Sequence, residues 1–278
     1  MATSDTDTLA SLVARSQQGE RAAVDALIHA LQPDIYKLAQ RFLMIPADAE
    51  DACQEILLKI LTRLSQYDGR SLFSTWAYAV ARNHLLDLKR RPFEQAMSFN
   101  EFAEDLAQGL SDQLAESAET ALQLEEIRIG CTLAMLQCLD RDLRLSYILG
   151  EILELEHQTA ADVLDISCDA YRKRLSRARS TVSNFMLGHC GLVNPNNACR
   201  CSKRVSQAIK LQRIDPAHLV FSSSTERTRK FPQLLAQIRS LEESQRAAAL
   251  YRAQSQPEAS ADFVQWIRTT VVYRELAE

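Results

Sequence analysis

The sequence predicts an all-α protein with two small helical domains, an acidic linker between them and a helical C-terminal extension. Glycine and proline contribute 7 residues each to a chain of 278, about 5% together against an ordinary total of roughly 12%. So few helix breakers favour helices, and apolar residues recur at spacings of three and four along much of the chain. Hydrophobic residues make up 46% of the sequence, enough for one large or two small cores. Barrels, sandwiches and collagen-like repeats are thereby disfavoured.

The compartment is predicted from the absence of targeting segments. No apolar run approaches the roughly 18 residues that a membrane span needs. Residues 1–9 lack the basic start and the apolar stretch of a signal peptide, so we expect a cytoplasmic chain without a membrane span. The 7 cysteines are an odd number in a chain without an export signal, which argues against a disulfide framework.

The first domain is expected over residues 1–92. Apolar positions follow helical spacing over residues 27–42 and again over residues 56–64, which predicts two amphipathic helices. Asp48 is a candidate N-cap of the second helix, because a proline stops the first helix just before it. A third helix is expected to run to Arg91, where the following proline ends it.

The linker is expected over residues 93–119. Residues 92–127 carry nine acidic groups and no basic group, and the periodicity over residues 93–119 is weak. This composition predicts a flexible tether with room for one short helix. Residues 167–187 carry five basic groups against one acidic group, so the net charge of −4 does not exclude nucleic-acid binding.

The second domain is expected over residues 120–188, where helical periodicity returns. The predicted helices cover residues 122–139, 143–155, 158–164 and 168–187. The last two have the lengths of a helix-turn-helix, in which the second helix enters the major groove of DNA.

The last of these helices carries the strongest functional signal. Ser167 is a good N-cap, and an apolar seam for the core is formed by Tyr171, Leu175, Ala178 and Val182. Basic side chains that can read guanine edges and neutralise phosphates project from the helix, namely Arg172, Lys173, Arg174, Arg177 and Arg179. The alternative interpretation is a solvated basic face that balances the acidic linker.

A second constellation lies at the end of the first domain. Asn83 and Asp87 share one face of the third predicted helix, where they contribute nothing to helix stability but can hydrogen-bond base edges. The basic end formed by Lys89, Arg90 and Arg91 can hold phosphates. Phe73 and Trp76 are three residues apart and are expected to pack in the core rather than stack on bases.

The C-terminal extension is expected over residues 189–278. His189, Cys190, Cys199 and Cys201 can supply thiolate and imidazole ligands to zinc or copper, or form a redox switch. Their spacing is not the usual spacing of zinc fingers, and structural or incidental cysteines are the alternative. Two amphipathic helices are predicted further on, over residues 231–254 and 257–276.

These residues resemble a known family. The run of residues 49–56, followed by Phe73-x-x-Trp76, Ala81-Arg82-Asn83, Asp87 and Arg90-Arg91, is similar to the second conserved region of bacterial sigma-70 factors of the extracytoplasmic-function (ECF) type. The helix-turn-helix is similar to their fourth region, on residues 163–167 and 174–179. Together the two resemblances cover about half of the chain, in the right order.

The resemblance implies a sigma factor that binds core RNA polymerase, directs it to promoters and assists strand opening. Asp51, Gln54 and Glu55 would bind the polymerase, on the beta-prime clamp helices, with the beta subunit as a further partner. The −10 promoter element would be bound by Arg82, Asn83, Asp87, Lys89, Arg90 and Arg91, and the −35 element by Arg172, Lys173, Arg174 and Arg177. An anti-sigma factor is a further partner that the resemblance allows.

No catalytic activity or required cofactor is predicted. The sequence lacks a Gly-x4-Gly-Lys loop, a His-Glu-x-x-His motif and a Gly-x-Ser-x-Gly motif, and opening DNA by capture of extruded bases needs no chemical step. The sequence departs from the family pattern at Thr159, Ala160, Asp165 and Tyr171. These departures affect the expected −35 specificity more than the expected fold. Two other function classes stay open: a free-standing helix-turn-helix regulator and a metal- or thiol-responsive helical adaptor. Within the sigma-factor interpretation, the extension is expected to be regulatory.

Overall fold

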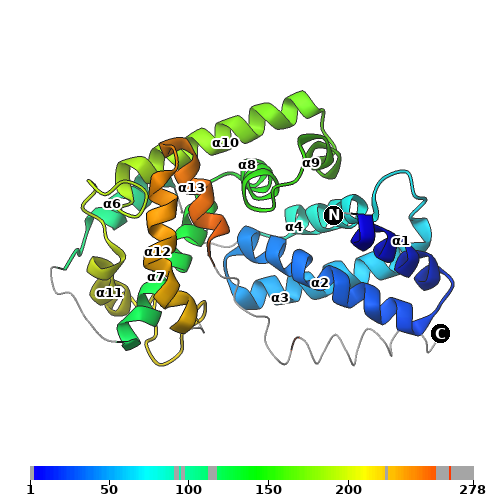
Figure 1. Ribbon diagram of the computed structural model, residues 1–278, viewed down its shortest axis with the longest axis horizontal. Helices are drawn as coiled ribbons and strands as arrows, with labels where there is room; N and C mark the ends of the chain where they lie inside the picture. Colours follow the sequence, from blue (N-terminus) through cyan, green and yellow to red (C-terminus); the bar gives the residue numbers. More distant parts are fainter. Residues whose placement is uncertain are drawn as a thin grey trace. The chain divides into compact units, whose positions relative to one another are not determined.

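The computed structural model describes residues 3–90, 94, 98–111, 118–222, 225–254 and 263, and these residues are helical without a β-strand. The chain divides into two compact units, each described here by itself. The first unit comprises Met1–Lys89, Glu156–Tyr171 and Glu258–Glu278, and the second comprises Arg90–Leu155 and Arg172–Pro257. The all-α prediction is confirmed (Figure 1).

The first unit is a bundle of α1 (Thr3–Gln17), α2 (Arg21–Leu43), α3 (Pro46–Thr62), the short 3-10 helix η1 (Leu64–Gln66), α4 (Phe73–Asp87) and α9 (His157–Leu164). The helices α2 and α3 run along each other (Figure 1), and α4 packs against both of them and against α9. The predicted apolar stripes meet in the core, where Leu27, Phe42, Ile56 and Ile60 are fully buried.

One predicted helix start in this unit is wrong. Helix α3 begins at Pro46, not after Asp48, and Asp48 lies in its first turn. Proline is favoured at the first helical position because its missing N–H would have no partner there, and its fixed φ suits the helix. An acidic residue in the first turn still stabilises the helix through the dipole.

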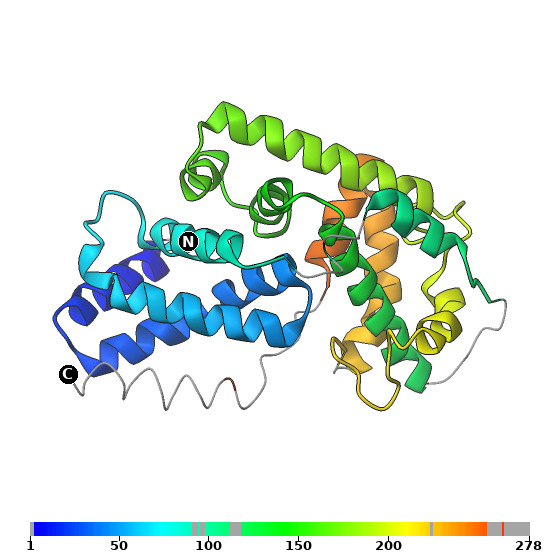
Figure 2. The same ribbon diagram turned by 180° about the vertical axis from the view of Figure 1, so that it is seen from behind.

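The second unit contains α6 (Phe99–Ala107), α7 (Ala118–Gln137), α8 (Arg141–Tyr147), a π-helical turn η2 (Ile148–Ile152), α11 (Cys201–Lys210), α12 (Thr225–Ser240) and α13 (Glu243–Arg252). The long helix α10 (Cys168–His189) belongs to it from Arg172 onward. Helices α11 and α12 both pack on α7, and α13 packs on α12 and on η2 (Figure 2).

Helices α9 and α10 have the lengths and the turn predicted for a helix-turn-helix. Asp165 ends α9 in the left-handed conformation, with φ 55° and ψ 48°, which aspartate tolerates at some cost. The Ser167 hydroxyl accepts a hydrogen bond of 3.2 Å from the backbone N–H of Ala170, so the predicted cap of α10 is confirmed. The predicted seam of α10 is buried at all four positions, Tyr171, Leu175, Ala178 and Val182.

The acidic segment is more ordered than a flexible tether. Ser98 and Glu101 form a capping box at the start of α6, and Phe102 and Leu106 are buried in the second unit. Asp105 accepts hydrogen bonds from Arg204 at 2.9 Å and Arg213 at 2.7 Å, both in the extension. The sequence left room for one short helix in this segment, and α6 is that helix; its residue Asp105 has a partner about 100 positions later in the chain.

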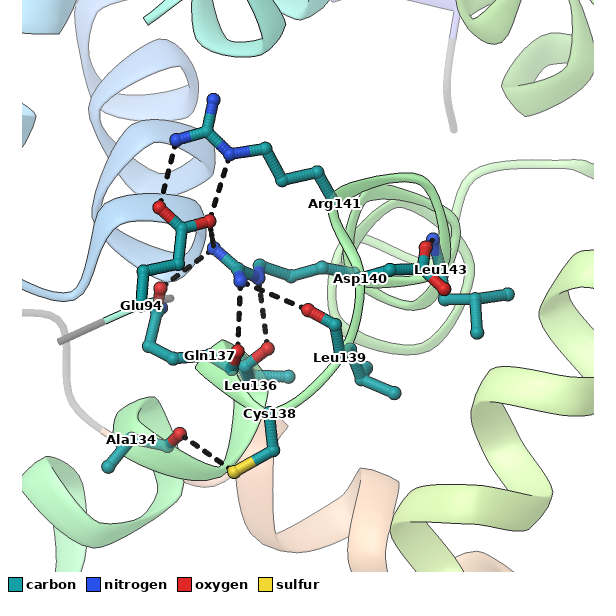
Figure 3. A network of polar contacts seen from close by, with 10 residues as sticks. Glu94, Ala134, Leu136, Gln137, Cys138, Leu139, Asp140, Arg141 and Leu143 are labelled. Carbon is teal, nitrogen blue, oxygen red and sulfur yellow. Dashed lines mark hydrogen bonds and ion pairs between the residues drawn. The ribbon is translucent and has the colours of Figure 1, made fainter. Parts of the chain in front are cut away.

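The start of this segment is also held within the second unit. Glu94 forms a bidentate ion pair with Arg141, at 2.8 and 2.9 Å, and a further pair with Arg144 at 3.0 Å (Figure 3). Burial alone would raise the pKa of Glu94, but the two guanidinium groups together hold it below its ordinary value. The Arg144 side chain is almost fully buried and also donates to the carbonyl oxygens of Leu136, Gln137 and Leu139.

The C-terminal extension is part of the second unit as far as Gln254, whereas Phe263 belongs to the first unit, where its ring centroid lies 6.0 Å from that of Tyr36. The buried carboxylate of Glu126 on α7 accepts three backbone N–H hydrogen bonds of 2.8 Å from Val220, Phe221 and Ser222. The Tyr251 hydroxyl donates to the carbonyl oxygen of Thr132, also on α7. These contacts dock the extension on α7.

The predicted helices of the extension are only partly correct. The single helix predicted over residues 231–254 is two helices, α12 and α13, separated at Leu241 and Glu242. Helix α11 was not predicted, because its polar residues conceal a short apolar stripe. The helix predicted over residues 257–276 lies outside the described residues, except for Phe263. No helix among the described residues is long and apolar enough to cross a membrane.

Candidate nucleic-acid interface

The predicted polymerase-binding residues lie on one side of α3. Ala52, Cys53 and Ile56 face the core of the first unit and are buried. Asp51 and Glu55 are exposed, and Gln54 is half-buried. The three residues therefore form an accessible polar face on a helix whose apolar side is fixed in the core. Such a face can accept hydrogen bonds from a basic partner and form ion pairs with it.

The predicted −10-binding residues lie on α4 and just after it. Asn83 and Asp87 lie one turn apart on the same face of α4, as their spacing predicts, and both side chains are exposed. Lys89 and Arg90 are exposed beyond the C-terminal end of α4. Arg91 lies outside the described residues. An amide, a carboxylate and two cations thus follow one another along an accessible edge.

Arg82 has a different environment from its neighbours. Its side chain is half-buried, and its Nε donates a hydrogen bond of 3.1 Å to the carbonyl oxygen of Val163 on α9, within the first unit. The guanidinium still has donors beyond Nε, because arginine carries five N–H groups. In this conformation Arg82 joins α4 to α9, a role that the sequence did not suggest.

His84 anchors α4 from its buried side. The Lys59 ammonium on α3 lies 2.8 Å from His84 Nδ1, which must accept the hydrogen bond because lysine only donates. Burial, followed by the charge of Lys59, lowers the pKa of His84. Nδ1 is then the acceptor of a neutral ring, and the protonated Nε2 is buried without a hydrogen-bond partner among the described residues. His84 therefore positions the helix that carries Asn83.

Aromatic residues support the start of α4. Phe73 is buried as predicted, whereas Trp76 is half-buried. Both rings contact Tyr67, with ring centroids 5.1 Å from Phe73 and 5.6 Å from Trp76. Tyr67 was missed in the sequence, although its Tyr-Asp-Gly turn marked the place. The three rings hold the exposed segment of residues 68–72 at the N-terminal end of α4.

The predicted −35-binding residues lie along α10. Arg172, Lys173 and Arg177 are exposed, and Arg174 is half-buried at 3.4 Å from Asp142 on α8. Arg179, further along, pairs with Glu151. Because the seam on the other side of α10 is buried, its basic residues have a fixed orientation on the surface of the second unit. Exposed pairs of this kind are worth at most about 1 kcal/mol, so Arg174 can exchange Asp142 for a phosphate.

The candidate metal ligands do not form a site around His189. The His189 ring packs against Phe185, with the ring centroids 4.7 Å apart. Cys190, Cys199 and Cys201 are half-buried free thiols. Within the described ranges, no three side chains of His, Cys, Asp or Glu have the arrangement of a preformed metal site.

Comparisons with known proteins match one of the two predicted regions and find sigma factors among the relatives. Residues 27–92 match the family described as Sigma-70 region 2. The RNA polymerase sigma-H factor of Pseudomonas aeruginosa is 32% identical over 182 residues, which are 63% of this chain and 92% of that protein. The ECF RNA polymerase sigma-E factor of Escherichia coli strain K12 is 29% identical over 178 residues, which are 62% of this chain and 91% of that protein.

A solved structure is also similar to this chain. It is described as CnrH in complex with the cytosolic domain of CnrY, and it is 23% identical. The match covers 63% of this chain and 94% of that chain, with a TM-score of 0.47.

Proposed function

The chain belongs to the ECF type of the sigma-70 family of RNA polymerase sigma factors, and we propose that it directs core RNA polymerase to particular promoters and assists opening of the −10 element. The observation that carries this proposal is a similarity extending over 92% of a sigma factor's length, together with exposed Asn83 and Asp87 on the helix that matches region 2. Sigma factors are initiation factors and not enzymes.

Polymerase binding is assigned to the polar face of α3. Asp51 and Glu55 are exposed carboxylates on a helix whose other side is fixed in the core, so they can meet a basic or polar surface without rearrangement of the fold. Gln54 adds a neutral donor and acceptor between them. The partner surface is proposed to be the beta-prime clamp helices of core RNA polymerase, with the beta subunit as a second contact. The site of action is accordingly the cytoplasm, where polymerase and promoter DNA are found.

Recognition of the −10 element is assigned to the exposed edge of α4. Asn83 can donate to and accept from the edge of one extruded base, and Asp87 can accept from an exocyclic amine. Lys89 and Arg90 follow at the helix end and can hold the adjoining phosphates. Binding of extruded bases then offsets the few kcal/mol that unstacking costs, so strand opening requires no nucleotide hydrolysis.

Recognition of the −35 element is assigned to α10. Arg172 and Lys173 lie within its first turns, and Arg177 follows on the exposed side. Arginine can form paired hydrogen bonds with a guanine edge in the major groove, while lysine is suited to phosphate. The buried seam supports the helix from behind. A free-standing helix-turn-helix regulator would use these residues as well, but it would leave the match of residues 27–92 to region 2 unexplained.

Transcription in vitro with purified core enzyme and a library of promoters tests the proposal. The full chain is expected to give sequence-dependent initiation, and an anti-sigma factor is not needed in this assay. Asn83→Ala should lower initiation by about tenfold, since losing good base contacts costs about 1–3 kcal/mol. Asn100→Ala is the matched control, because Asn100 is an exposed asparagine on α6.

The affinity of Asn83→Ala for core polymerase is measured in parallel. It should equal that of the unchanged chain, because Asn83 is on α4 and the proposed polymerase face is on α3. No sequence-dependent initiation by the unchanged chain would refute the proposed function. Equal activity of Asn83→Ala and Asn100→Ala would refute the assignment of Asn83 to the −10 element.

A further inference from the structure

Helix α13 of the C-terminal extension packs against the elements that hold α10. It starts beside α10 (Figure 1), where the Ser183 hydroxyl of α10 donates a hydrogen bond of 3.3 Å to the carbonyl oxygen of Ser244. Further along, α13 packs on the π-helical turn η2. Its apolar side is fully buried at Ala247, Leu250 and Tyr251. Helix α13 is therefore a fixed part of the fold around the proposed −35-binding helix.

Tyr251 anchors the end of α13 on two other helices of the second unit. Its hydroxyl donates a hydrogen bond of 2.9 Å to the carbonyl oxygen of Thr132 on α7. Its ring meets the ring of Tyr147, the last residue of α8, edge to face with centroids 5.6 Å apart. Because Tyr147 directly precedes η2 in the chain, Tyr251 brings the residue that follows it, Arg252, to η2.

Arg252 fixes the end of η2. Its Nη1 donates a hydrogen bond of 3.1 Å to the carbonyl oxygen of Glu151 and lies 2.9 Å from the carboxylate of Glu154. Carbonyl groups in the last turn of a helix lack a partner within the helix, so the guanidinium supplies one. Glu154 has a φ of 54°, a left-handed conformation that is uncommon for glutamate. The Arg252 side chain thus holds both η2 and the turn after it.

The same Glu151 also contacts α10. Its buried carboxylate accepts a hydrogen bond of 2.9 Å from Nε of Arg179 on α10 and a second one from Nη2 of that residue. Hydrogen bonds between a guanidinium and a carboxylate are strong and directional. A series of contacts therefore runs from Arg252 on α13 through Glu151 on η2 to Arg179 on α10.

Both flanks of the buried seam of α10 are held by polar contacts. Arg179 and Ser183 are four residues apart and lie on one flank, where η2 and α13 hold them. Arg174 lies on the other flank, 3.4 Å from Asp142 on α8. Burial of apolar surface has no preferred direction, so the seam sets the depth of the helix more strictly than its rotation. The directional contacts on the flanks fix the rotation of α10 about its own axis.

The rotation of α10 decides where its exposed basic residues point. Arg172, Lys173 and Arg177 are exposed, and neighbouring side chains of an α-helix point about 100° apart. Paired hydrogen bonds between arginine and a guanine edge require an aligned guanidinium, whereas phosphate contacts carry no sequence information. A small rotation of α10 would therefore cost base contacts while its cations stay close to DNA.

We propose that Arg252 is a positioning residue for recognition of the −35 element, and that it acts through Glu151 and Arg179 on the rotation of α10. The proposal rests on the −35-binding function proposed for α10, and it makes α13 of the extension a part of promoter selection. This role differs from general stabilisation. The side chains of Arg252 and Glu154 are 34% and 64% exposed, and exposed ion pairs contribute little to the free energy of unfolding.

The base specificity of the reconstituted polymerase complex tests the proposal. A −35 duplex from a promoter selected in the transcription library is compared with a duplex of scrambled −35 sequence at one salt concentration. Arg252→Gln should lower the ratio of the two affinities by about tenfold, the effect of losing one good base contact. The affinity for the scrambled duplex should not change, because every proposed phosphate-binding cation is still present.

The matched control is Arg246→Gln, which removes the same charge from the same helix. Arg246 donates to the carbonyl oxygens of Leu241 and Val193, which lie outside η2 and α10. Arg246→Gln should keep the affinity for both duplexes. Circular dichroism should show the helical content of the unchanged chain in both variants.

Hydrogen exchange of the free chain tests the same contacts without DNA. Arg252→Gln should lose protection over residues 148–155 and 179–183, whereas Arg246→Gln should keep it. The combination of Arg252→Gln with Arg179→Gln tests the series of contacts. Because both residues act through Glu151, the double variant should lower the affinity ratio no more than the larger single change does.

Four results would overturn the proposal. A folded Arg252→Gln with an unchanged affinity ratio would remove the positioning role, as would unchanged protection of α10. Additive losses in the double variant would show that Arg252 does not act through Arg179. Equal losses on both duplexes, with the salt slope lowered by about 1, would make Arg252 a phosphate contact. If the unchanged chain selects no promoter, the proposed function fails, and hydrogen exchange still decides whether Arg252 holds α10.

Discussion

The two units use their charged residues in different ways. In the first unit the charged or amide side chains that the sequence singles out are mostly on the surface, as Asp51, Asn83 and Asp87 are. In the second unit many charged side chains pair with one another within the fold. Glu94 pairs with Arg141 and Arg144, and Asp105 pairs with Arg204 and Arg213. The net charge of a segment therefore does not equal the charge that it offers to a partner.

The acidic linker shows this difference most clearly. Its carboxylates lack basic neighbours in the sequence, which suggests a solvated tether. In the structure Glu94 and Asp105 are partly buried against arginines of α8 and of the extension. Burial of one partner without the other would be costly, so these charges hold the linker segment on the second unit.

The largest effect is expected for a buried arginine of the second unit. Arg144→Ala removes four hydrogen bonds to backbone and side-chain oxygen atoms and leaves Glu94 with Arg141 alone, which should cost about 3–5 kcal/mol. Urea unfolding followed by circular dichroism measures the loss. Hydrogen exchange of α7 and α8 assigns it to the second unit, since a chain with two units need not unfold in one step.

The control for this prediction is an exposed ion pair of the first unit. Arg70 is paired with Asp68 at 2.5 Å, and its side chain is 89% exposed. Arg70→Ala should change the stability by no more than about 1 kcal/mol. Similar losses for the two variants would contradict the distinction between surface charges in the first unit and structural charges in the second.

A smaller, pH-dependent effect is expected in the first unit. The pKa of His84 is lowered by burial and by Lys59, although the carboxylates of Glu55 and Asp87 act in the opposite direction. The unfolded chain therefore takes up this proton more readily, and stability falls as the pH drops through about 6.5, the ordinary pKa of histidine. One titrating group limits the slope to about 1.4 kcal/mol per pH unit.

Unfolding free energies between pH 5.5 and pH 8 measure this effect. His84→Gln keeps a polar side chain beside Lys59 but cannot titrate, so the pH slope should become smaller. His29→Gln makes the same replacement at an exposed histidine of α2 and serves as the control. An equal slope in the unchanged chain and in His84→Gln would show that protonation of His84 does not contribute to the pH dependence of the unfolding free energy.

Local patterns in the sequence predicted much of the fold. Periodicity identified the buried seam of α10 because every fourth or third residue of a packed helix must be apolar, and Ser167 was identified as a cap by its type and position. The same reasoning failed at Asp48, because proline at the first helical position competes with an N-cap signal two residues later.

Features that depend on distant residues could not be predicted in this way. Residues 93–119 were expected to form a flexible tether with room for one short helix, because the partners of Asp105, Arg204 and Arg213, are far along the chain. In the candidate site, the common helix face of Asn83 and Asp87 followed from their spacing, whereas the Arg82 hydrogen bond to Val163 did not.

The smallest effect is expected on α10, which carries both exposed cations and a cation that is paired within the fold. Arg177 is exposed, and Arg174 is half-buried with Asp142 3.4 Å away. For the reconstituted polymerase complex bound to a −35 duplex, Arg177→Gln should lower the slope of log affinity against log salt by about 1. Arg174→Gln should lower it by less, because Asp142 already neutralises part of the Arg174 charge.

The smaller effect of Arg174→Gln has two explanations: Asp142 neutralises Arg174, or Arg174 does not contact DNA. Asp142→Asn distinguishes between them. Asp142→Asn removes the charge that pairs with Arg174 and keeps Arg174 itself, so the affinity for the duplex should rise slightly. In the Asp142→Asn background, Arg174→Gln should then lower the salt slope as much as Arg177→Gln does. The stability should change by less than about 1 kcal/mol, because the pair is partly exposed. If Arg174→Gln has the same small effect with and without Asp142, Arg174 does not contact DNA, and the recognition surface of α10 is limited to its fully exposed cations.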